Sequence, residues 1–169
     1  MQAAQPSGRP DPHDYRHAMA RYATGVSVVA TSRDGVRYGM TVNSLASVSL
    51  DPTLILFCCE RDSSLHDPLM DAGVWGVSVL SAAQQPVAAW FATRGIPGVD
   101  QFNDQDVRAG ALTGAPLLND ALAWFECRTW ATYDGGDHTI VVGEVVNLGC
   151  GDDPPGLLYF RSQYAQTED

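Results

Sequence analysis

The sequence contains no lysine, and all ten of its basic residues are arginine. This absence excludes a Walker-type phosphate loop and a pyridoxal Schiff base, because both need a lysine amine. An anionic ligand must therefore be held by backbone N–H groups, by hydroxyls or by arginine.

Positive charge is also scarce, with 10 basic residues against 20 acidic ones and a net charge of −10. Such a balance argues against nucleic acid and anionic membranes as partners. The sequence has no apolar run near the roughly 20 residues of a membrane span, and its N-terminus lacks a signal-peptide core. We expect no membrane association and a cytoplasmic location.

Several functional signatures are missing. No Gly-x-Gly-x-x-Gly fingerprint follows a strand pattern, and no Gly-x-Ser-x-Gly elbow is present. His13 and His17 have the spacing of two ligands on a helix but lack a third, so no metal site is expected.

Cysteines are few, and their spacing matches neither a disulfide scaffold nor a metal knuckle. They stand at Cys58, Cys59, Cys127 and Cys150. We expect them to be reduced. Cys58 and Cys59 are adjacent in a strand pattern and should point to opposite faces, as core residues rather than a redox pair.

The 169 residues, 45% of them hydrophobic, suit one compact domain. Residues 1–12 are expected to form a disordered tail and residues 13–165 the domain. Asp11 and Pro12 have the form of a helix start, and an amphipathic helix is predicted to end near Gly25. Two further short helices are predicted, from Ser64 through Met70 and over residues 87–92.

Strand patterns dominate the rest of the chain. The Asp34-Gly35 pair predicts a hairpin, and a second, longer hairpin is predicted near residue 138. Residues 93–116 are interpreted as a long surface loop. The other strands are expected at residues 54–59, 74–80 and 157–160. About seven strands and three short helices predict a mainly β (α+β) protein with an antiparallel sheet or barrel.

The segment from Gly39 to Ser49 interleaves small polar side chains with apolar ones. One interpretation is a polar edge strand whose hydroxyls bond to its own backbone. The other is a surface that binds a flat ring and a phosphate without lysine. A second segment, from Gly135 to Thr139, places His138 at a hairpin tip, where it is either simply exposed or meets a ligand.

These segments together resemble the short-chain flavin reductases, the reductase components of two-component flavin-dependent monooxygenases. The similarity covers residues 15–164. It is carried by the motifs Thr24-Gly25-Val26, Gly39-Met40-Thr41-Val42-Asn43-Ser44, Ser47-Val48-Ser49-Leu50-Asp51-Pro52, Gly136-Asp137-His138-Thr139 and Gly143-Glu144-Val145. Two positions depart from the family pattern: Ser162 stands where glycine is frequent, and Thr53 replaces a second proline.

The resemblance implies a split β-barrel of the FMN-binding type that works as a homodimer. It implies that His138 faces the nicotinamide, as the catalytic position, and that Ser63 and Ser64 approach the flavin phosphate. The other cofactor-binding positions that it implies are Thr24, Gly25, Met40, Thr41, Val42, Asn43, Ser44, Ser47, Arg161 and Tyr164.

The implied activity is that of an NAD(P)H:flavin oxidoreductase, which reduces FMN or FAD with NADH or NADPH. The reduced flavin would then diffuse to a partner monooxygenase. Recognition of NADPH would require an arginine such as Arg37, Arg94 or Arg161 at the 2′-phosphate. Two alternatives stay open: a barrel that retains its flavin as a sensor, carrier or other enzyme, and an interaction subunit with a degenerate pocket.

Overall fold

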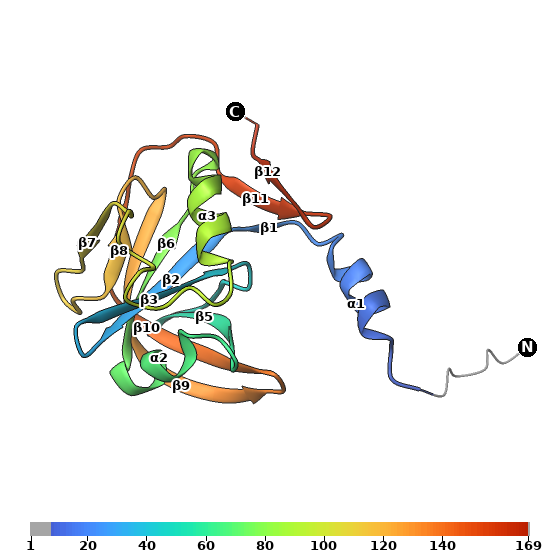
Figure 1. The fold of residues 1–169 in the computed structure, drawn as a ribbon, viewed down its shortest axis with the longest axis horizontal. Helices are drawn as coiled ribbons and strands as arrows, with labels where there is room; N and C mark the ends of the chain where they lie inside the picture. The colour runs from blue at the N-terminus through green and yellow to red at the C-terminus, as the bar shows by residue number, and fades with distance from the viewer. Residues whose placement is uncertain (1–7, 169) are drawn as a thin grey trace, which may run out of the picture.

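The computed structural model describes residues 8–168 and is mainly β with short helices (Figure 1). The helical elements are α1 (Pro12–Met19), α2 (His66–Ala72), the 3₁₀ turn η1 (Ala82–Gln84) and α3 (Gln85–Phe91). The strands are β1 (Thr24–Gly25), β2 (Ser27–Arg33), β3 (Val36–Val42), β4 (Ala46–Leu50), β5 (Thr53–Glu60), β6 (Val74–Val79), β7 (Val107–Ala109), β8 (Pro116–Leu118), β9 (Ala123–Gly135), β10 (His138–Cys150), β11 (Leu157–Phe160) and β12 (Gln163–Gln166).

The central sheet has seven antiparallel strands in the order β3-β2-β6-β9-β10-β5-β4. β3 and β4 are consecutive in the chain, yet they form its two opposite edges. The sheet must therefore curl so that residues 43–45 can pass from one edge to the other. The predicted split β-barrel is confirmed.

Two apolar clusters fill the barrel and its flank. Inside the barrel, Phe57 and Trp75 are fully buried and pack edge to face with ring centroids 5.1 Å apart. The second cluster lies under α3, where Phe91 and Phe102 pack with centroids 4.9 Å apart. This second cluster holds α3 and the following loop against β3, beside the cavities described below.

The predicted turns and helix caps are confirmed at positions where the backbone needs a particular residue type. Asp34 and Gly35 join β2 to β3 with φ angles of 52° and 78°. Gly136, with φ of 79°, closes the β9–β10 hairpin. The Asp11 side chain accepts a hydrogen bond from His13 N–H at the start of α1, and Gly73 ends α2 in the left-handed conformation.

Two helix boundaries were predicted wrongly. α1 begins at Pro12 behind the Asp11 cap, as predicted, but it ends at Met19, not near Gly25. The predicted tail up to residue 7 lies outside the described residues. α2 begins at His66 with Leu65 at its N-cap, so the Ser64 cap is not formed. Ser64 instead lines a cavity.

The predicted loop over residues 93–116 contains a strand that the sequence did not reveal. β7 pairs with β8 as a short hairpin, and β12 adds a further strand where only a polar tail was expected. Within this loop, Phe102 is buried and Val107 is half-buried, but Leu112 is 59% exposed.

A buried carboxylate fixes this loop to the barrel. Glu126 in β9 accepts hydrogen bonds from Leu112 N–H, from Thr113 N–H and hydroxyl, and from the Asn147 amide. Burial alone raises its pKa, but the donors on Asn147, Thr113 and Leu112 outweigh burial and hold the pKa below the ordinary value. The charged form of Glu126 therefore stabilises the fold.

The cysteines are free thiols, as expected. Cys59 and Cys127 are fully buried, and burial raises their pKa values to about 11 and about 12. Cys58 is half-buried and Cys150 is exposed. Two of the four thiols are thus unreactive in the folded chain.

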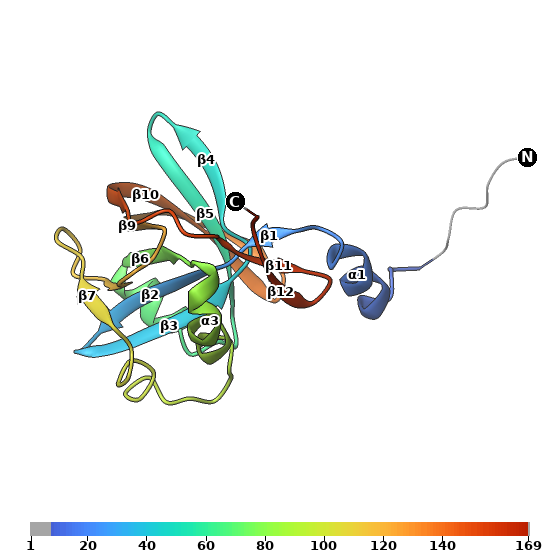
Figure 2. The ribbon, with the colours of Figure 1, turned by 90° about the horizontal axis from the view of Figure 1, so that it is seen from above.

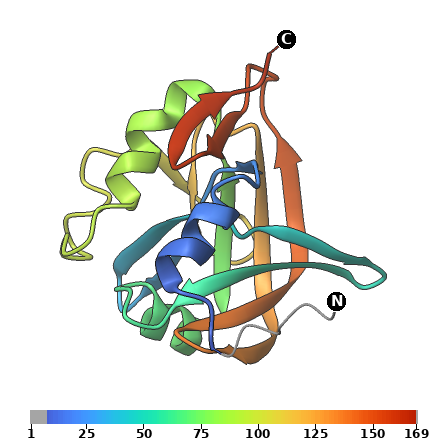
Figure 3. The ribbon, with the colours of Figure 1, turned by 90° about the vertical axis from the view of Figure 1, so that its right-hand side faces the viewer.

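α1 stands apart from the barrel as an arm beside the β11–β12 hairpin (Figures 2 and 3). It buries none of its residues, and one backbone bond, from Arg161 N–H to Ala20 C=O at 2.7 Å, ties its end to the hairpin turn. No helix within residues 8–168 has the length and apolarity needed to cross a membrane.

Candidate functional site

Three adjoining cavities follow β3 and its exit toward residue 43. The first has a volume of about 520 Å³, the second about 200 Å³ and the third about 410 Å³. Thr41 lines both the first and the second, and Asn43 lines both the second and the third. Because they share these residues, the three cavities adjoin one another, and together they are called the trench below.

The structure gathers most of the predicted site residues in this trench. The first cavity is lined by Met40, Thr41, Ser63 and Ser64, the second by Thr41, Val42, Asn43 and Tyr164, and the third by Thr24, Gly25, Asn43 and Ser44. These residues are up to 140 positions apart in the chain, and the barrel brings them to one place.

Several of the predicted hydroxyls are already bonded within the chain. The Thr41 hydroxyl donates to Ala88 C=O at 2.7 Å, and the Ser63 hydroxyl donates to Glu60 C=O at 2.7 Å. Ser44 accepts from Cys58 N–H at 3.0 Å. Thr41 and Ser44 thus bond to the backbone of α3 and β5. The first interpretation expected bonded hydroxyls, but it placed the partners in the segment's own backbone. The exposed Ser64 hydroxyl and Asn43 amide can turn toward a ligand.

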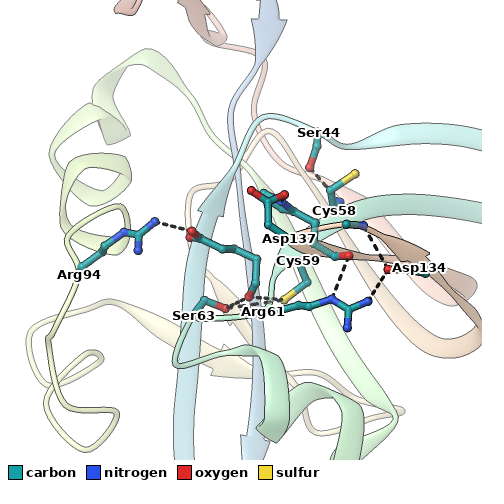
Figure 4. Close-up of polar contacts among 11 residues, drawn as sticks. Ser44, Cys58, Cys59, Arg61, Ser63, Arg94, Asp134 and Asp137 are labelled. Atoms are coloured by element: carbon teal, nitrogen blue, oxygen red, sulfur yellow. Dashed lines mark hydrogen bonds and ion pairs between the residues drawn. The ribbon is translucent and has the colours of Figure 1, made fainter. Parts of the chain in front are cut away.

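Charged groups meet in the first cavity (Figure 4). Arg94, from the loop after α3, forms an ion pair with the Glu60 carboxylate at the end of β5, and Asp62 also lines the cavity. Arg94 is 75% exposed, whereas Glu60 is 31% exposed. An incoming anion can therefore attract the guanidinium away from Glu60.

Gly39 sets the close approach of β3 to α3 at this cavity. A Cβ at this position would lie 2.8 Å from the Phe91 ring and 2.9 Å from Phe102. The Gly39 N–H donates to the buried Gln101 side chain at 3.0 Å, which ties β3 to the following loop. Only a glycine lets this wall of the cavity pack so tightly.

The second cavity has an aromatic wall from the β11–β12 hairpin. Tyr159 and Tyr164 are paired across the hairpin, with ring centroids 5.6 Å apart and planes at 65°. Burial raises the pKa of Tyr164, and the neighbouring Tyr159 adds to the shift. Tyr164 therefore presents a neutral phenol to the cavity at physiological pH.

Thr24, which lines the third cavity, has an unsatisfied hydroxyl. Thr24 Oγ1 is buried and, within residues 8–168, is the one buried side-chain nitrogen or oxygen with no hydrogen-bond partner. A buried polar atom without a partner is costly to the fold, so this hydroxyl marks a strained point in the wall of the third cavity.

His138 lies beside the trench rather than in its wall. It is the direct register partner of Glu60, so the two side chains lie on one face of the sheet. Its Nδ1 is 2.7 Å from the Asp137 carboxylate. Arg61 braces the hairpin tip by donating to Asp134 at 2.7 Å and to His138 C=O at 3.3 Å (Figure 4).

Two predicted residues lie away from the trench in this chain. Ser47 is exposed on the edge strand β4 and lines none of the described cavities. Arg161 lies at the β11–β12 turn, in a separate cavity beside α1. The sequence reasoning did not place Glu60, Phe91 or Gln101 at the site. Glu60 follows a strand pattern directly, which was a usable signal, whereas Gln101 lay in the region interpreted as loop.

The chain matches the model of the flavin reductase like domain over residues 19–168. It is 41% identical to an NADH-dependent FAD reductase of Streptomyces globisporus over 95% of this chain and 90% of that protein. It is 40% identical to the NADH-dependent FMN reductase SmoA of Agrobacterium fabrum over 88% of this chain and 82% of that one.

Among solved structures, it resembles BorF, the flavin reductase component of a bacterial two-component tryptophan halogenase. The TM-score is 0.89 and the identity 44%, over 94% of this chain and 99% of BorF. The trench, the barrel and these matches agree, and the chain belongs to the flavin reductase like family.

Proposed function

We propose that this protein is an NADH-dependent flavin reductase that reduces FAD or FMN and releases the reduced flavin to a separate flavin-dependent monooxygenase. The observation that carries the proposal is the trench, in which Thr41 and Asn43 each line two adjoining cavities of the polar, aromatic and Thr24-lined set. The relatives named for NADH support the choice of donor.

The residues present suit a flavin. Arg94, Ser64 and the backbone of residues 62–64 would hold its phosphate, which fits a chain without lysine. Val42, Asn43 and the two tyrosines of the second cavity would pack along the ring, and the Thr24 hydroxyl would find its missing partner on the ligand. Ser47 on β4 and Arg161 at the β11–β12 turn lie outside the trench, and we propose that they also contact the bound cofactors.

When bound, the flavin accepts a hydride at its ring from the nicotinamide. The protein's task is to hold the two rings in contact and exclude other geometries. Asn43 can donate to the ring edge, where negative charge develops. His138, held through Asp137, would orient the dinucleotide. The trench is open to solvent and no covalent attachment is needed, which suits a flavin that leaves after reduction.

The test follows NADH absorbance with purified protein and added FAD, FMN or neither, and then repeats the series with NADPH. We expect rapid NADH oxidation that depends on added flavin, and slower oxidation of NADPH. Protein that binds flavin but oxidises neither donor would overturn the reductase proposal and favour the flavin-retaining alternative.

We also propose that the functional unit is a homodimer built on α1. The arm exposes Tyr15 by 60%, Met19 by 47% and, just beyond the end of α1, Tyr22 by 67%. Light scattering on the intact chain should give twice the chain mass. The double variant Tyr15→Ser, Met19→Ser should shift toward the monomer, whereas Tyr133→Ser, an equally exposed tyrosine on β9, should not.

A further inference from the structure

The first cavity of the trench has a buried amide in its wall. Gln101, from the loop after α3, lines this cavity, yet only 4% of the residue is exposed. Its backbone is held on both sides, because Gln101 N–H donates to Gly98 C=O at 3.3 Å and Gln101 C=O accepts from the Trp90 indole N–H at 2.7 Å. The next residue, Phe102, packs under α3. The side chain of Gln101 therefore starts from a fixed point at the cavity.

One hydrogen bond fixes the direction in which this amide points. Gly39 N–H, in β3, donates to Gln101 Oε1 at 3.0 Å. A backbone N–H can only donate, so the atom that faces it must be the amide oxygen, and the NH₂ group must point to the other side. The orientation of the amide is thus set by the chain itself.

The NH₂ group of Gln101 is a donor without a partner. Within residues 8–168, its Nε2 donates to no acceptor of the chain, whereas Oε1 is bonded to Gly39. Thr24 Oγ1 is the one fully enclosed side-chain atom without a partner in that part of the chain, so Nε2 is not enclosed by protein. Gln101 and Gly39 both line the first cavity, and the free donor opens into it. A fixed amide with unused N–H groups is suited to an oxygen acceptor on a ligand.

The charges around this cavity make a neutral donor useful there. The lining holds one arginine and two carboxylates. Arg94 is already paired with Glu60, and Asp62 adds a second negative charge. The chain has no lysine that could offset them. An anion bound in the first cavity therefore needs N–H donors that carry no charge, and the Gln101 amide is one of them.

Burial distinguishes this donor from the others at the same place. Arg94 is 75% exposed and Ser64 is also exposed, so both side chains lose conformational freedom when they bind a ligand. Gln101 has already lost that freedom through its bonds to Gly39 and Trp90. Its contact with a ligand therefore needs no further ordering of the side chain.

We propose that Gln101 is a flavin-binding residue whose side-chain NH₂ group donates a hydrogen bond to the flavin phosphate, while its oxygen holds β3 through Gly39. The assignment rests on the proposed function, which puts the flavin phosphate in the first cavity. It adds to Arg94 and Ser64 a neutral donor that is already in position. Gln101 thus serves the wall of the cavity with one end of its amide and the ligand with the other.

Two variants of the intact protein separate these two tasks. Gln101→Glu keeps an oxygen for Gly39 N–H but replaces the NH₂ group by a second oxygen, which repels a phosphate. Gln101→Met removes both ends of the amide and adds no charge. Affinities are measured by quenching of flavin fluorescence at pH 8, which keeps the new carboxyl ionised. FMN and FAD affinity should fall about fivefold in Gln101→Met and about fiftyfold in Gln101→Glu.

The order of the two losses decides between a ligand contact and a purely structural role. If Gln101 acted only through Gly39, Gln101→Glu would keep that hydrogen bond, and Gln101→Met would bind flavin more weakly of the two. That order would overturn the proposal. The matched control is Gln85→Glu, the same substitution at an exposed residue of α3 that lines none of the three cavities of the trench. This control should bind FMN like the wild type.

Riboflavin, which has no phosphate, identifies the group that Gln101 contacts. Gln101→Glu should weaken riboflavin binding by less than about twofold, because the repulsion needs a charged phosphate. An equal loss for riboflavin and FMN would overturn the phosphate assignment.

The outcome is separable from the proposed function, because flavin binding is measured without NADH. A wild-type protein that fails to oxidise NADH with any flavin would end the reductase proposal. The flavin affinities of the two Gln101 variants and of Gln85→Glu would still decide whether Gln101 contacts the flavin.

Discussion

Arg94 and Glu60 form an ion pair inside the cavity that both residues line, and they are 34 positions apart in the chain. A flavin phosphate bound there would compete with the Glu60 carboxylate for the same guanidinium. Arg94→Gln should weaken FAD binding by about tenfold through the loss of a charge-assisted contact. Glu60→Gln should tighten it by about threefold, because an exposed pair of this kind contributes less than about 1 kcal/mol.

Quenching of flavin fluorescence measures both affinities. Arg128→Gln, which removes one charge from an exposed residue of β9, serves as the charge-matched control and should bind FAD like the wild type. Equal weakening by both cavity variants would show that the pair maintains the local fold, and that Arg94 does not contact the phosphate.

His138→Ala should affect the donor more than the flavin. The His138 imidazole Nδ1 lies 2.7 Å from the Asp137 carboxylate, and its side chain is on the same sheet face as Glu60, beside the trench. Loss of one hydrogen bond to the dinucleotide should lower kcat/KM for NADH by about tenfold, with unchanged FAD affinity. Asp137→Asn keeps the imidazole of His138 but weakens the contact that orients it, so it should give a smaller loss of kcat/KM for NADH. A collapse of FAD affinity with normal NADH dependence would refute this role.

Glu126→Gln should destabilise the fold in a pH-dependent way. An amide has one oxygen, so its NH₂ group would face either Asn147 or the donors of Thr113 and Leu112. We expect a loss of about 2 kcal/mol in the free energy of unfolding at pH 7. Urea titration with an intrinsic tryptophan signal measures it.

The sign of the pH effect follows from the lowered pKa of Glu126. A depressed folded-state pKa stabilises the protein above the ordinary value of 4.5, and this contribution is lost as pH falls through the folded-state pKa. The difference between wild type and Glu126→Gln should therefore be largest near neutrality and shrink in acid. A difference that grows as pH falls below 4.5 would contradict this assignment.

Thiol labelling should divide the cysteines into two classes. Cys150 is exposed and should react first with a thiol reagent at neutral pH, followed by the half-buried Cys58. Cys59 and Cys127, whose pKa values are raised to about 11 and about 12, should react only after unfolding. Mass spectrometry of peptides from native and denatured samples identifies the labelled positions. Native labelling of Cys127 would mean that the barrel opens readily.

The sequence predicted correctly the turns and helix caps whose conformation depends only on neighbouring residues. Asp34-Gly35 and Gly136 require positive φ, and the helix caps at Asp11 and Gly73 act within one turn. The strands of the barrel carry their own apolar patterns, so the mainly β class was predictable. The positive φ of Ser162, 60°, also explains why glycine would suit that position.

The parts that were missed depend on distant partners. β7 and β8 exist because Glu126, from another strand, accepts the hydrogen bonds of Leu112 and Thr113 between them. The polar strand β12 is held by pairing with β11. Likewise, Glu60 and Arg94 meet only once the barrel has formed, and no spacing in the sequence shows it.

The arm α1 has a thermodynamic consequence. A helix of eight residues is marginally stable in water on its own, and this one buries no side chain in its own chain. If a second chain orders it, folding and association become one linked equilibrium, and stability becomes a function of protein concentration. The thermal midpoint should then rise as the protein is concentrated. Dilute conditions would weaken the arm first.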